Sequence, residues 1–454
     1  MSNLTERLRG IVKPARALVD GSGLAPATAE RSAPGQPPDD RAVAGAALAR
    51  SPDERLDAAL GGSWIDSGAV RCYVVERRIS ADHYHGNVQV GALAETLIRT
   101  EADAPLLANG APARLPFVFF DLETTGLSGG AGTYAFLVGC SWFDAENGFV
   151  TRQYVLYRAA DERPMLQAVA SHLSTAGALV SFNGRSFDAP LLETRFLYHR
   201  LPWIAGRLPH VDVLHPARRF WRSSASAGEP TSCSLGTLER LLLGADRPDD
   251  VPGFEVPARY FQFVRSGDAR PLAGVLEHNR MDLLSLAALT ARLLRLVNVG
   301  AGAAGDAREA LALGRIFERA GLLDRAADAY ERTLVFAGPR RASLDAILLR
   351  AEALRGLALL SRRSRRYDQA ADRWREILDL PGCPRPLVRE AAEALAIHHE
   401  HRLGDLVAAR SFALRTLDVG LAVRRNDAVR HRLGRLERKM TARTPPVGRP
   451  LFTE

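Results

Sequence analysis

The sequence predicts an α/β fold with a mixed five-stranded sheet flanked by helices, followed by an all-α region. Two observations lead to this fold class. Up to about residue 299, short apolar runs typical of buried strands alternate with amphipathic segments typical of helices. After the Gly- and Ala-rich stretch 300–305, small and apolar residues recur only at helical spacing. A chain of 454 residues also exceeds one core, so at least two domains are expected.

The expected strands come as three in succession and then two separated by helices. The polar turn 144–148 joins the second strand to the third and predicts a hairpin. Amphipathic helices are expected at 161–177, at 190–201 and, as one long helix, at 271–299. The strands themselves are expected at 117–123, 134–143, 149–157, 178–182 and 210–214.

The all-α region contains an internal repeat. Small residues flanked by Leu and aromatic residues recur around Ala327, Ala371 and Ala409, at offsets of 44 and 38 residues. Such positions let paired helices stack closely, which resembles tetratricopeptide repeats. The offsets exceed the roughly 34 residues of that repeat, so we interpret the region as degenerate helical hairpins.

These differences in composition and periodicity divide the chain into five segments. The first lacks any periodicity and is rich in Ala, Pro, Gly and Ser, so we expect it to be disordered or linker-like. The second has a strand-like pattern among arginines and predicts a small β-containing subdomain. In order, the segments are a linker-like 1–58, a subdomain at 59–112, the α/β domain at 113–299, the tetratricopeptide-like domain at 306–440 and a tail at 441–454.

Composition excludes several classes of protein. The chain has four scattered cysteines with no Cys-x-x-Cys pair, which argues against a zinc knuckle or a disulfide framework. No uninterrupted apolar stretch would span a bilayer and no secretory signal is present, so we expect a cytoplasmic protein without a membrane partner. The net charge of +8 permits a polyanionic partner, and Arg218, Arg219 and Arg222 are candidate phosphate contacts.

Two carboxylates follow the first strand. Phe117–Phe120 form an apolar run, and Asp121 and Glu123 come at its end, two residues apart. Side chains two apart share one face of a strand, so both carboxylates can point at one spot beyond the strand. Two hard oxygen donors converging there suit Mg²⁺ or Mn²⁺.

Two later segments supply matching groups. The segment 181–188 is a strand end and turn that delivers Asn183 and Asp188, and the long helix carries His278 and Asp282. Positions i and i+4 share one helix face, so His278 and Asp282 project together. Four carboxylates from three distant segments are what a two-metal phosphodiester site requires.

In this order, the three motifs resemble the DEDD exonucleases of the RNase H-like superfamily. With the helical C-terminal region, the chain looks most like the YprB-like bacterial branch. The resemblance covers about 115–298 for the nuclease domain. It implies a 3′-to-5′ exonuclease acting on DNA or RNA, with two Mg²⁺ or Mn²⁺ ions bound by Asp121, Glu123, Asp188 and Asp282.

The resemblance also suggests roles for further residues. Thr124, Asn183 and Phe187 are expected to contact the substrate, which would be single-stranded nucleic acid, and His278 is expected to take part in catalysis. The third motif departs from the family pattern. One branch has Tyr four residues before the last Asp and the other has His five before it, whereas here His278 lies four before and Glu277 five before.

Other interpretations stay open at this point. Asp188 is also a plausible helix N-cap before Ala189–Pro190, and His278 an ordinary surface residue of its helix. Asp212 and His215 flank the fifth strand and are further candidates for the site. The alternative function is a catalytically weak adaptor, which binds nucleic acid through the α/β domain and a protein partner through the helical repeats.

Overall fold

The computed structural model describes residues 52–67, 70–126, 132–222, 232–338, 343–416 and 423–443. The expected linker-like segment up to residue 51 and the tail after residue 443 lie outside the described residues. The linker was placed too far along the chain, because helix α2 (Pro52–Leu60) already begins at Pro52 and buries Leu56 and Leu60.

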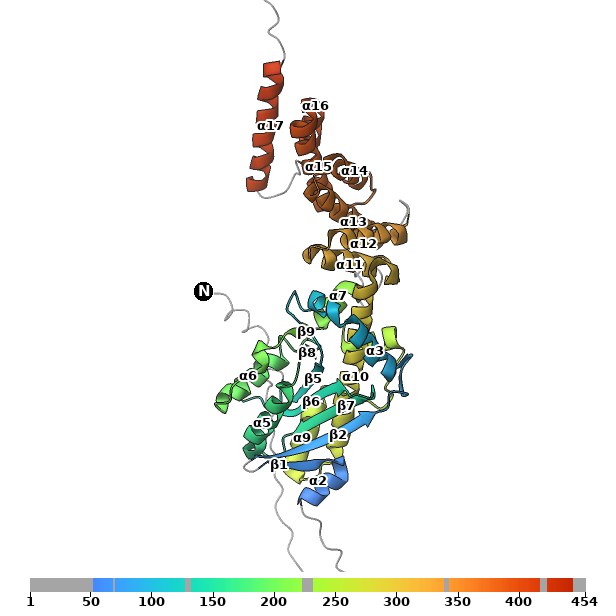
Figure 1. Ribbon diagram of the computed structural model, residues 1–454. Coiled ribbons are helices and arrows are strands. Elements are labelled where there is room, and N and C mark those ends of the chain that lie inside the picture. The colour runs from blue at the N-terminus through green and yellow to red at the C-terminus, as the bar shows by residue number, and fades with distance from the viewer. Residues whose placement is uncertain are drawn as a thin grey trace, which may run out of the picture. The chain divides into compact units, whose positions relative to one another are not determined.

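One mixed sheet forms the centre of the α/β part (Figure 1). β5 lies parallel to β8, and β8 lies parallel to β9, whereas the other pairs are antiparallel. The predicted mixed sheet flanked by helices is thereby confirmed. Its strands, in spatial order, are β1 (Ser63–Ser67), β2 (Val70–Ile79), β7 (Phe149–Val155), β6 (Ala135–Phe143), β5 (Phe117–Thr124), β8 (Ala178–Ser181) and β9 (His210–Asp212).

The sheet has seven strands where five were expected. β2 pairs with β7 over seven residues, from Tyr73 opposite Val155 to Ile79 opposite Phe149, and β1 pairs with the outer edge of β2. Residues 59–112 were expected to form a small separate subdomain, and this placement was wrong for the two strands. The edge of β7 needs a partner for its backbone groups, and β2 supplies it. A separate two-stranded hairpin, β3 (Tyr84–His85) with β4 (Val88–Gln89), follows β2.

Helices cover both faces of the sheet because β5 buries both of its faces. Phe117 and Phe119 belong to a core cluster with helices α3 and α10, whereas Val118 and Phe120 belong to a second cluster with α5 and α6. The helices of this part are α3 (Val90–Thr100), α4 (Ala104–Leu107), α5 (Glu162–Leu173), α6 (Asp188–Tyr198), α7 (Leu214–Trp221), α8 (Leu235–Leu238), α9 (Val256–Ser266) and α10 (Arg270–Val299).

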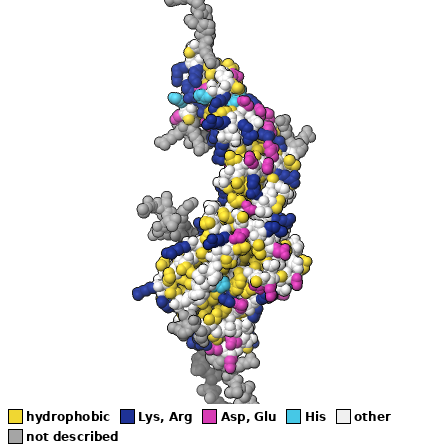
Figure 2. All heavy atoms as spheres, viewed as in Figure 1, with side chains coloured by type: hydrophobic (Ala, Val, Ile, Leu, Met, Phe, Trp, Pro, Cys, Tyr) yellow, Lys and Arg dark blue, Asp and Glu magenta, His cyan; other side chains and the backbone are white. Residues whose placement is uncertain are grey.

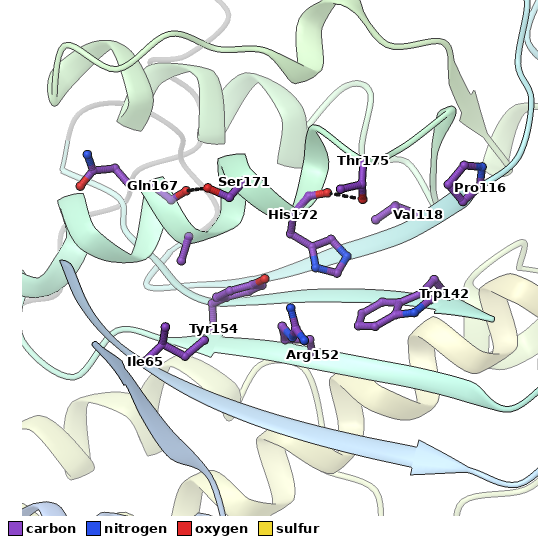
Figure 3. A pocket seen from close by; sticks show the side chains of 11 residues that line it. Ile65, Pro116, Val118, Trp142, Arg152, Tyr154, Gln167, Ser171, His172 and Thr175 are labelled. Atoms are coloured by element: carbon purple, nitrogen blue, oxygen red, sulfur yellow. Dashed lines mark hydrogen bonds between the residues drawn. The ribbon is translucent and has the colours of Figure 1, made fainter. Parts of the chain in front are cut away.

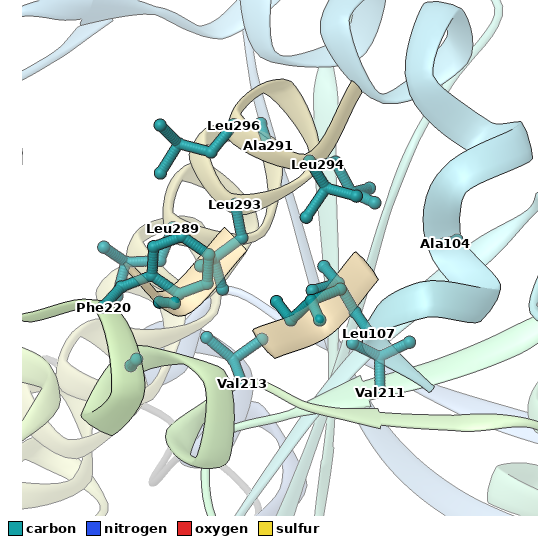
Figure 4. Close-up of a cluster of buried hydrophobic side chains, with 14 of the residues drawn as sticks. Ala104, Leu107, Val211, Val213, Phe220, Leu289, Ala291, Leu293, Leu294 and Leu296 are labelled. Atoms are coloured by element: carbon teal, nitrogen blue, oxygen red, sulfur yellow. The ribbon is translucent and has the colours of Figure 1, made fainter. Parts of the chain in front are cut away.

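Helix α10 is the central helix of the fold. By length and mean hydropathy the segment Arg270–Ala303 could span a membrane, although no uninterrupted apolar stretch was expected from the sequence. However, 78% of its apolar window is buried inside the protein, as in the core helix of a water-soluble domain. Leu289 and Leu293 of α10 lie beside Phe220, and Val213 belongs to the same buried cluster (Figure 4).

The C-terminal region is all-helical, as predicted. Neighbouring helices contact one another in succession along the chain. The first core cluster continues from α10 into the buried Leu313, Phe317 and Tyr330, so the core does not stop at the Gly/Ala stretch 300–305. Division into separate domains at that stretch remains a prediction. The helices are α11 (Ala307–Arg319), α12 (Leu323–Ala337), α13 (Leu344–Arg363), α14 (Tyr367–Leu378), α15 (Arg385–His398), α16 (Leu406–Arg415) and α17 (Val423–Arg443).

Candidate active site

Asp121 and Glu123 lie at the carboxyl end of β5, next to α10. Asp121 pairs with Gly139 of β6, where an added Cβ would lie 2.1 Å from Oδ1 of Asn279. The absence of a side chain at Gly139 therefore lets α10 approach the strand closely. Asn279 is fully buried and its Nδ2 donates a hydrogen bond to Oδ2 of Asp121 at 3.0 Å. Its Oδ1 accepts one from Nε2 of Gln153, which fixes the amide orientation.

Asp188 is the first residue of α6, and the N-cap position belongs to Phe187. The helix-cap interpretation of Asp188 is therefore wrong. The preceding turn brings Asn183 into the left-handed region at φ 68° and is held by the buried Asp212. Oδ1 of Asp212 accepts the backbone N–H of Asn183 at 2.8 Å, and Oδ2 accepts that of Arg185 at 3.2 Å. Asp212 thus positions the turn that presents Asp188.

His278 and Asp282 project from the same face of α10 toward Glu123. Nε2 of His278 lies 3.6 Å from Oδ2 of Asp282 and 4.0 Å from Oε1 of Glu123. Nδ1 of His278 is hydrogen-bonded to Oδ1 of Asp250 at 2.7 Å. His278 is mostly buried rather than an ordinary surface residue of its helix. Nδ1 thus faces Asp250 and Nε2 faces Asp282 and Glu123. Burial lowers the pKa of His278, but the charges of these carboxylates outweigh it and raise that pKa above its usual value.

Arg247 neutralises part of this cluster. Its Nη1 lies 2.7 Å from Oδ1 of Asp282, and its Nη2 lies 2.8 Å from Oε2 of the buried Glu239. Nη2 also donates to Oγ of Ser285, which is hydrogen-bonded to Nε2 of the buried His85. The buried His85 therefore belongs to the hydrogen-bond network beneath Asp282.

Burial and mutual repulsion raise the pKa of the carboxylates. The pKa of Asp121 lies well above its usual value because the group is buried and faces Asp188, Glu123 and Asp282. Burial, together with Asp282 and Asp188, raises the pKa of Glu123 to about 8, although the charge of His278 opposes this. The pKa of Asp188 rises to about 7 through burial and the charge of Asp212. The charges of Asp188, Glu123 and Asp282 all raise the pKa of Asp121, so these carboxylates lie close to one another and negative charge predominates among them.

The donors suit a hard divalent cation in type, since they are carboxylate oxygens with excess negative charge. As the side chains stand, no three His, Cys, Asp or Glu residues of the described chain are grouped closely enough to hold an ion. Part of the reason is that Asp282 faces Arg247. A bound ion would have to replace that guanidinium as the partner of Asp282.

The three expected substrate contacts are Thr124, Asn183 and Phe187. Along the chain, each is close to one of the site carboxylates. Oγ1 of Thr124 donates to the carbonyl of Gly126, next to a strand bulge after Glu123. Phe187 is 58% exposed, so its ring is free to meet a ligand. The structure leaves the substrate roles of Thr124, Asn183 and Phe187 untested.

Residues that sequence reasoning missed are Asn279, Arg247 and Asp250. Asn279 had a usable signal, because it lies three residues before Asp282 and positions i and i+3 are neighbours on a helix. Arg247 and Asp250 lie in an irregular stretch between α8 and α9, where no periodicity points to a site. Of the two open candidates, Asp212 supports the site, and Nε2 of His215 lies 4.0 Å from its Oδ2.

A cavity of about 560 Å³ lies elsewhere, between α5 and the sheet (Figure 3). Trp142, Tyr154 and His172 line it together with Arg152. Burial lowers the pKa of His172 to about 4, so this imidazole is neutral at pH 7. The cavity contains none of the predicted site carboxylates.

Residues 118–294 match the model of the RNase H superfamily. The fold and the carboxylates at the end of its central strand thus define a protein with an RNase H-like domain, a class associated with nucleic-acid chemistry. The chain is 30% identical over 384 residues to the uncharacterized protein YprB of Bacillus subtilis (strain 168), over 82% of this chain and 87% of the relative. The protein belongs to the same family as YprB.

Proposed function

We propose that the protein is a metal-dependent 3′–5′ exonuclease that hydrolyses terminal phosphodiesters of single-stranded DNA or RNA by a two-metal mechanism. The observation that carries this proposal is the set of interacting carboxylates from three distant segments. Asp121, Glu123 and Asp188 all have raised pKa values, and Asp282 contributes to two of these shifts. Buried carboxylates that repel one another destabilise a fold unless a bound ligand compensates their charge.

Asp121, Glu123, Asp188 and Asp282 would hold two Mg²⁺ or Mn²⁺ ions. When bound, such ions neutralise the developing charge and activate the attacking water. The protein's own side chains would supply orientation. Asn279 holds the carboxylate of Asp121 through a hydrogen bond of 3.0 Å.

His278 would accept or orient the proton of the attacking water at Nε2. Its Nδ1 is engaged by Asp250 at 2.7 Å, so Nε2 is the nitrogen that can act on the side of Glu123 and Asp282. Thr124, Asn183 and Phe187 would position the terminal nucleotide. We further propose that the protein acts in the cytoplasm and that its tetratricopeptide-like helical repeats bind a protein partner.

One observation favours the adaptor as a second candidate. Asp282 is already paired with Arg247, with 2.7 Å between Nη1 and Oδ1. If this pair persists in the presence of divalent ions, only three of the four carboxylates remain to bind metal. The protein would then bind nucleic acid with little or no turnover.

A degradation assay separates the two candidates. Single strands of DNA and RNA, labelled at the 3′ or the 5′ end, are incubated with increasing Mg²⁺ or Mn²⁺. The exonuclease predicts metal-dependent loss of the 3′ label as mononucleotide, while 5′-labelled strands shorten progressively. Binding without shortening at every metal concentration would contradict it and support the adaptor. The variant Asp121→Asn is the control for a contaminating nuclease.

A further inference from the structure

A polar cavity lies behind the turn that carries Asp188. It has a volume of about 250 Å³ and is lined by Arg185, His210, Asp212, His215 and Arg219. Arg185 belongs to the same turn as Asn183 and Asp188, and Asp212 of the cavity wall raises the pKa of Asp188, so the cavity lies next to this turn of the candidate active site. Its wall also includes Ile316 of α11, so the first helix of the C-terminal region contributes to it.

Positive charge exceeds negative charge around this cavity. Arg315 and Arg319 are four residues apart on α11, on the face next to Ile316, and both are close enough to influence Arg219. Partial burial, together with these two positive charges, lowers the pKa of Arg219. In the described part of the chain, no carboxylate lies within 4.0 Å of the guanidinium groups of Arg185, Arg219 or Arg319.

One carboxylate, that of Asp212, also lines the cavity. Oδ1 of Asp212 accepts the backbone N–H groups of Asn183 and Leu214, and Oδ2 accepts that of Arg185. Asp212 therefore holds the turn, and its single negative charge offsets only part of the positive charge around the cavity. Burial lowers the pKa of His210 to about 4, so this imidazole is neutral at pH 7 and its Nε2 is hydrogen-bonded to Oγ of Ser181.

Two other arginines of α11 form ion pairs with carboxylates. Arg308 is paired with Asp345 at 2.7 Å, and Arg315 with Glu352 at 3.2 Å. Figure 2 shows the same mixture of basic and acidic side chains over the helical region. The unpaired state of Arg185, Arg219 and Arg319 is therefore not simply the result of an arginine-rich composition.

We propose that this cavity binds an internal phosphodiester of the nucleic-acid strand whose 3′ end enters the active site. The proposal rests on the proposed function, because it assigns the path of that substrate. A guanidinium group can donate two parallel hydrogen bonds to phosphate oxygens, and a phosphate would balance the excess positive charge of Arg185, Arg219 and Arg319. The strand would cross Arg185 and reach Arg219 and Arg319, so that α11 takes part in substrate binding.

The test measures binding without hydrolysis. A labelled, unphosphorylated single strand of about 12 nucleotides is titrated in chelator at several salt concentrations. We expect Arg219→Ala to weaken binding about five- to tenfold and to reduce the slope of log affinity against log salt by about 0.7. Arg219→Lys should keep the slope and lose only part of the affinity, because it keeps the charge without the paired donors.

Arg415→Ala is the matched control, since Arg415 is an exposed arginine of α16. Equal affinity and slope for Arg219→Ala and Arg415→Ala would overturn the proposal. Preferential binding of a free nucleoside monophosphate over the strand would overturn it too. Because no metal is present, the result is independent of catalysis. A changed slope without any nuclease activity would keep the cavity and reject the exonuclease.

Discussion

At the scale of single residues, the candidate site places several carboxylates close together in a buried environment. Asp121 is held by Asn279 yet surrounded by three other carboxylates, so its ionised form is costly in the metal-free protein. A divalent cation would reverse this balance. Asp121, Glu123 and Asp188, whose pKa values are raised, therefore destabilise the metal-free fold when ionised, and a bound ion would stabilise it.

Replacing Asp121 should separate stability from activity. We expect Asp121→Asn to raise the free energy of unfolding of the metal-free protein by about 1 to 2 kcal/mol, because a buried charge is removed. Addition of Mg²⁺ should raise the melting temperature of the wild type but not of the variant, and hydrolysis should be lost. Thermal unfolding with and without Mg²⁺ measures this. Glu277→Gln is the control, because Glu277 is exposed and forms an ion pair with Arg280 of its own helix. An equal Mg²⁺ response in both proteins would contradict the site.

Asp250 should act through His278 rather than by itself. We expect His278→Ala to lower kcat about 10²–10⁴-fold and Asp250→Ala to lower it less, with KM nearly unchanged in both. The double variant should be no slower than His278→Ala alone, because the two residues form one unit. His278→Tyr should retain part of the rate. Additive losses in the double variant would show that Asp250 has a separate role.

At the scale of elements, α10 determines where the site forms. It lies against β6 at Gly139, and from there it supplies Asn279 to Asp121 and His278 and Asp282 to Glu123. Helix α10 thus supplies polar groups to the site from residues 278–282 and apolar core side chains from residues 283–297. Small changes in the distance between α10 and the sheet should therefore affect stability and the site together.

Gly139→Ala tests this contact. The new Cβ would lie 2.1 Å from Oδ1 of Asn279 and 2.8 Å from Cδ1 of Leu283, so the helix must move outward. We expect a loss of about 1–3 kcal/mol in the free energy of unfolding, together with lower activity. Gly236→Ala is the control, because no atom of the residues that the structure describes lies within 4 Å of its added Cβ. Chemical denaturation measures both variants, and equal stabilities would contradict the close approach.

Helix α17 should be held in a pH-dependent manner. The buried Glu400 lies 2.7 Å from both Arg435 and Lys439, and the hydrogen bond from Arg435 is the main reason that its pKa falls to about 2. Because the folded pKa is lower than the unfolded value near 4.5, this stabilisation is complete above pH 4.5. It is lost as the pH falls from there toward 2.

Hydrogen exchange of the amides of α17 at pH 7 and pH 3 measures this effect. Protection of α17 should decrease at pH 3 in the wild type. In Glu400→Gln it should already be reduced at pH 7, by about 1 to 3 kcal/mol. Glu437→Gln is the control on α17, because Glu437 forms an exposed pair with Arg410. Unchanged protection in Glu400→Gln would rule out this anchor.

At the scale of the whole molecule, the α/β part and the first helical hairpins share a hydrophobic core. Leu313 and Phe317 of α11 belong to the same buried cluster as Leu293 and Leu294 of α10. Nε1 of Trp221 also donates to Oε1 of Glu309 at 2.9 Å. The sequence pattern thus changes at the Gly/Ala stretch 300–305, but the hydrophobic core continues from α10 into α11.

Truncation tests whether the parts fold separately. We expect a chain that ends at residue 303 to be less soluble and to melt at a lower temperature than one that ends at residue 337. The shorter chain exposes the apolar surface that α11 and α12 cover, whereas the longer one keeps both helices. Thermal unfolding and solubility of the two chains measure this. Equal melting temperatures would instead support the independent domains that the sequence suggested.

The sequence by itself determined the mixed sheet, the long helix, the all-helical C-terminal region and the carboxylates at Asp121, Glu123, Asp188 and Asp282. These features depend on local periodicity and on residue spacing, which a single chain displays directly. Only the tertiary structure decided that β2 extends the sheet, that Asn279 holds Asp121, and that Arg247 and Asp250 reach Asp282 and His278. These contacts join residues far apart in the chain or in irregular stretches, where no period marks a partner. They form because buried polar and backbone groups must find partners once the core is packed.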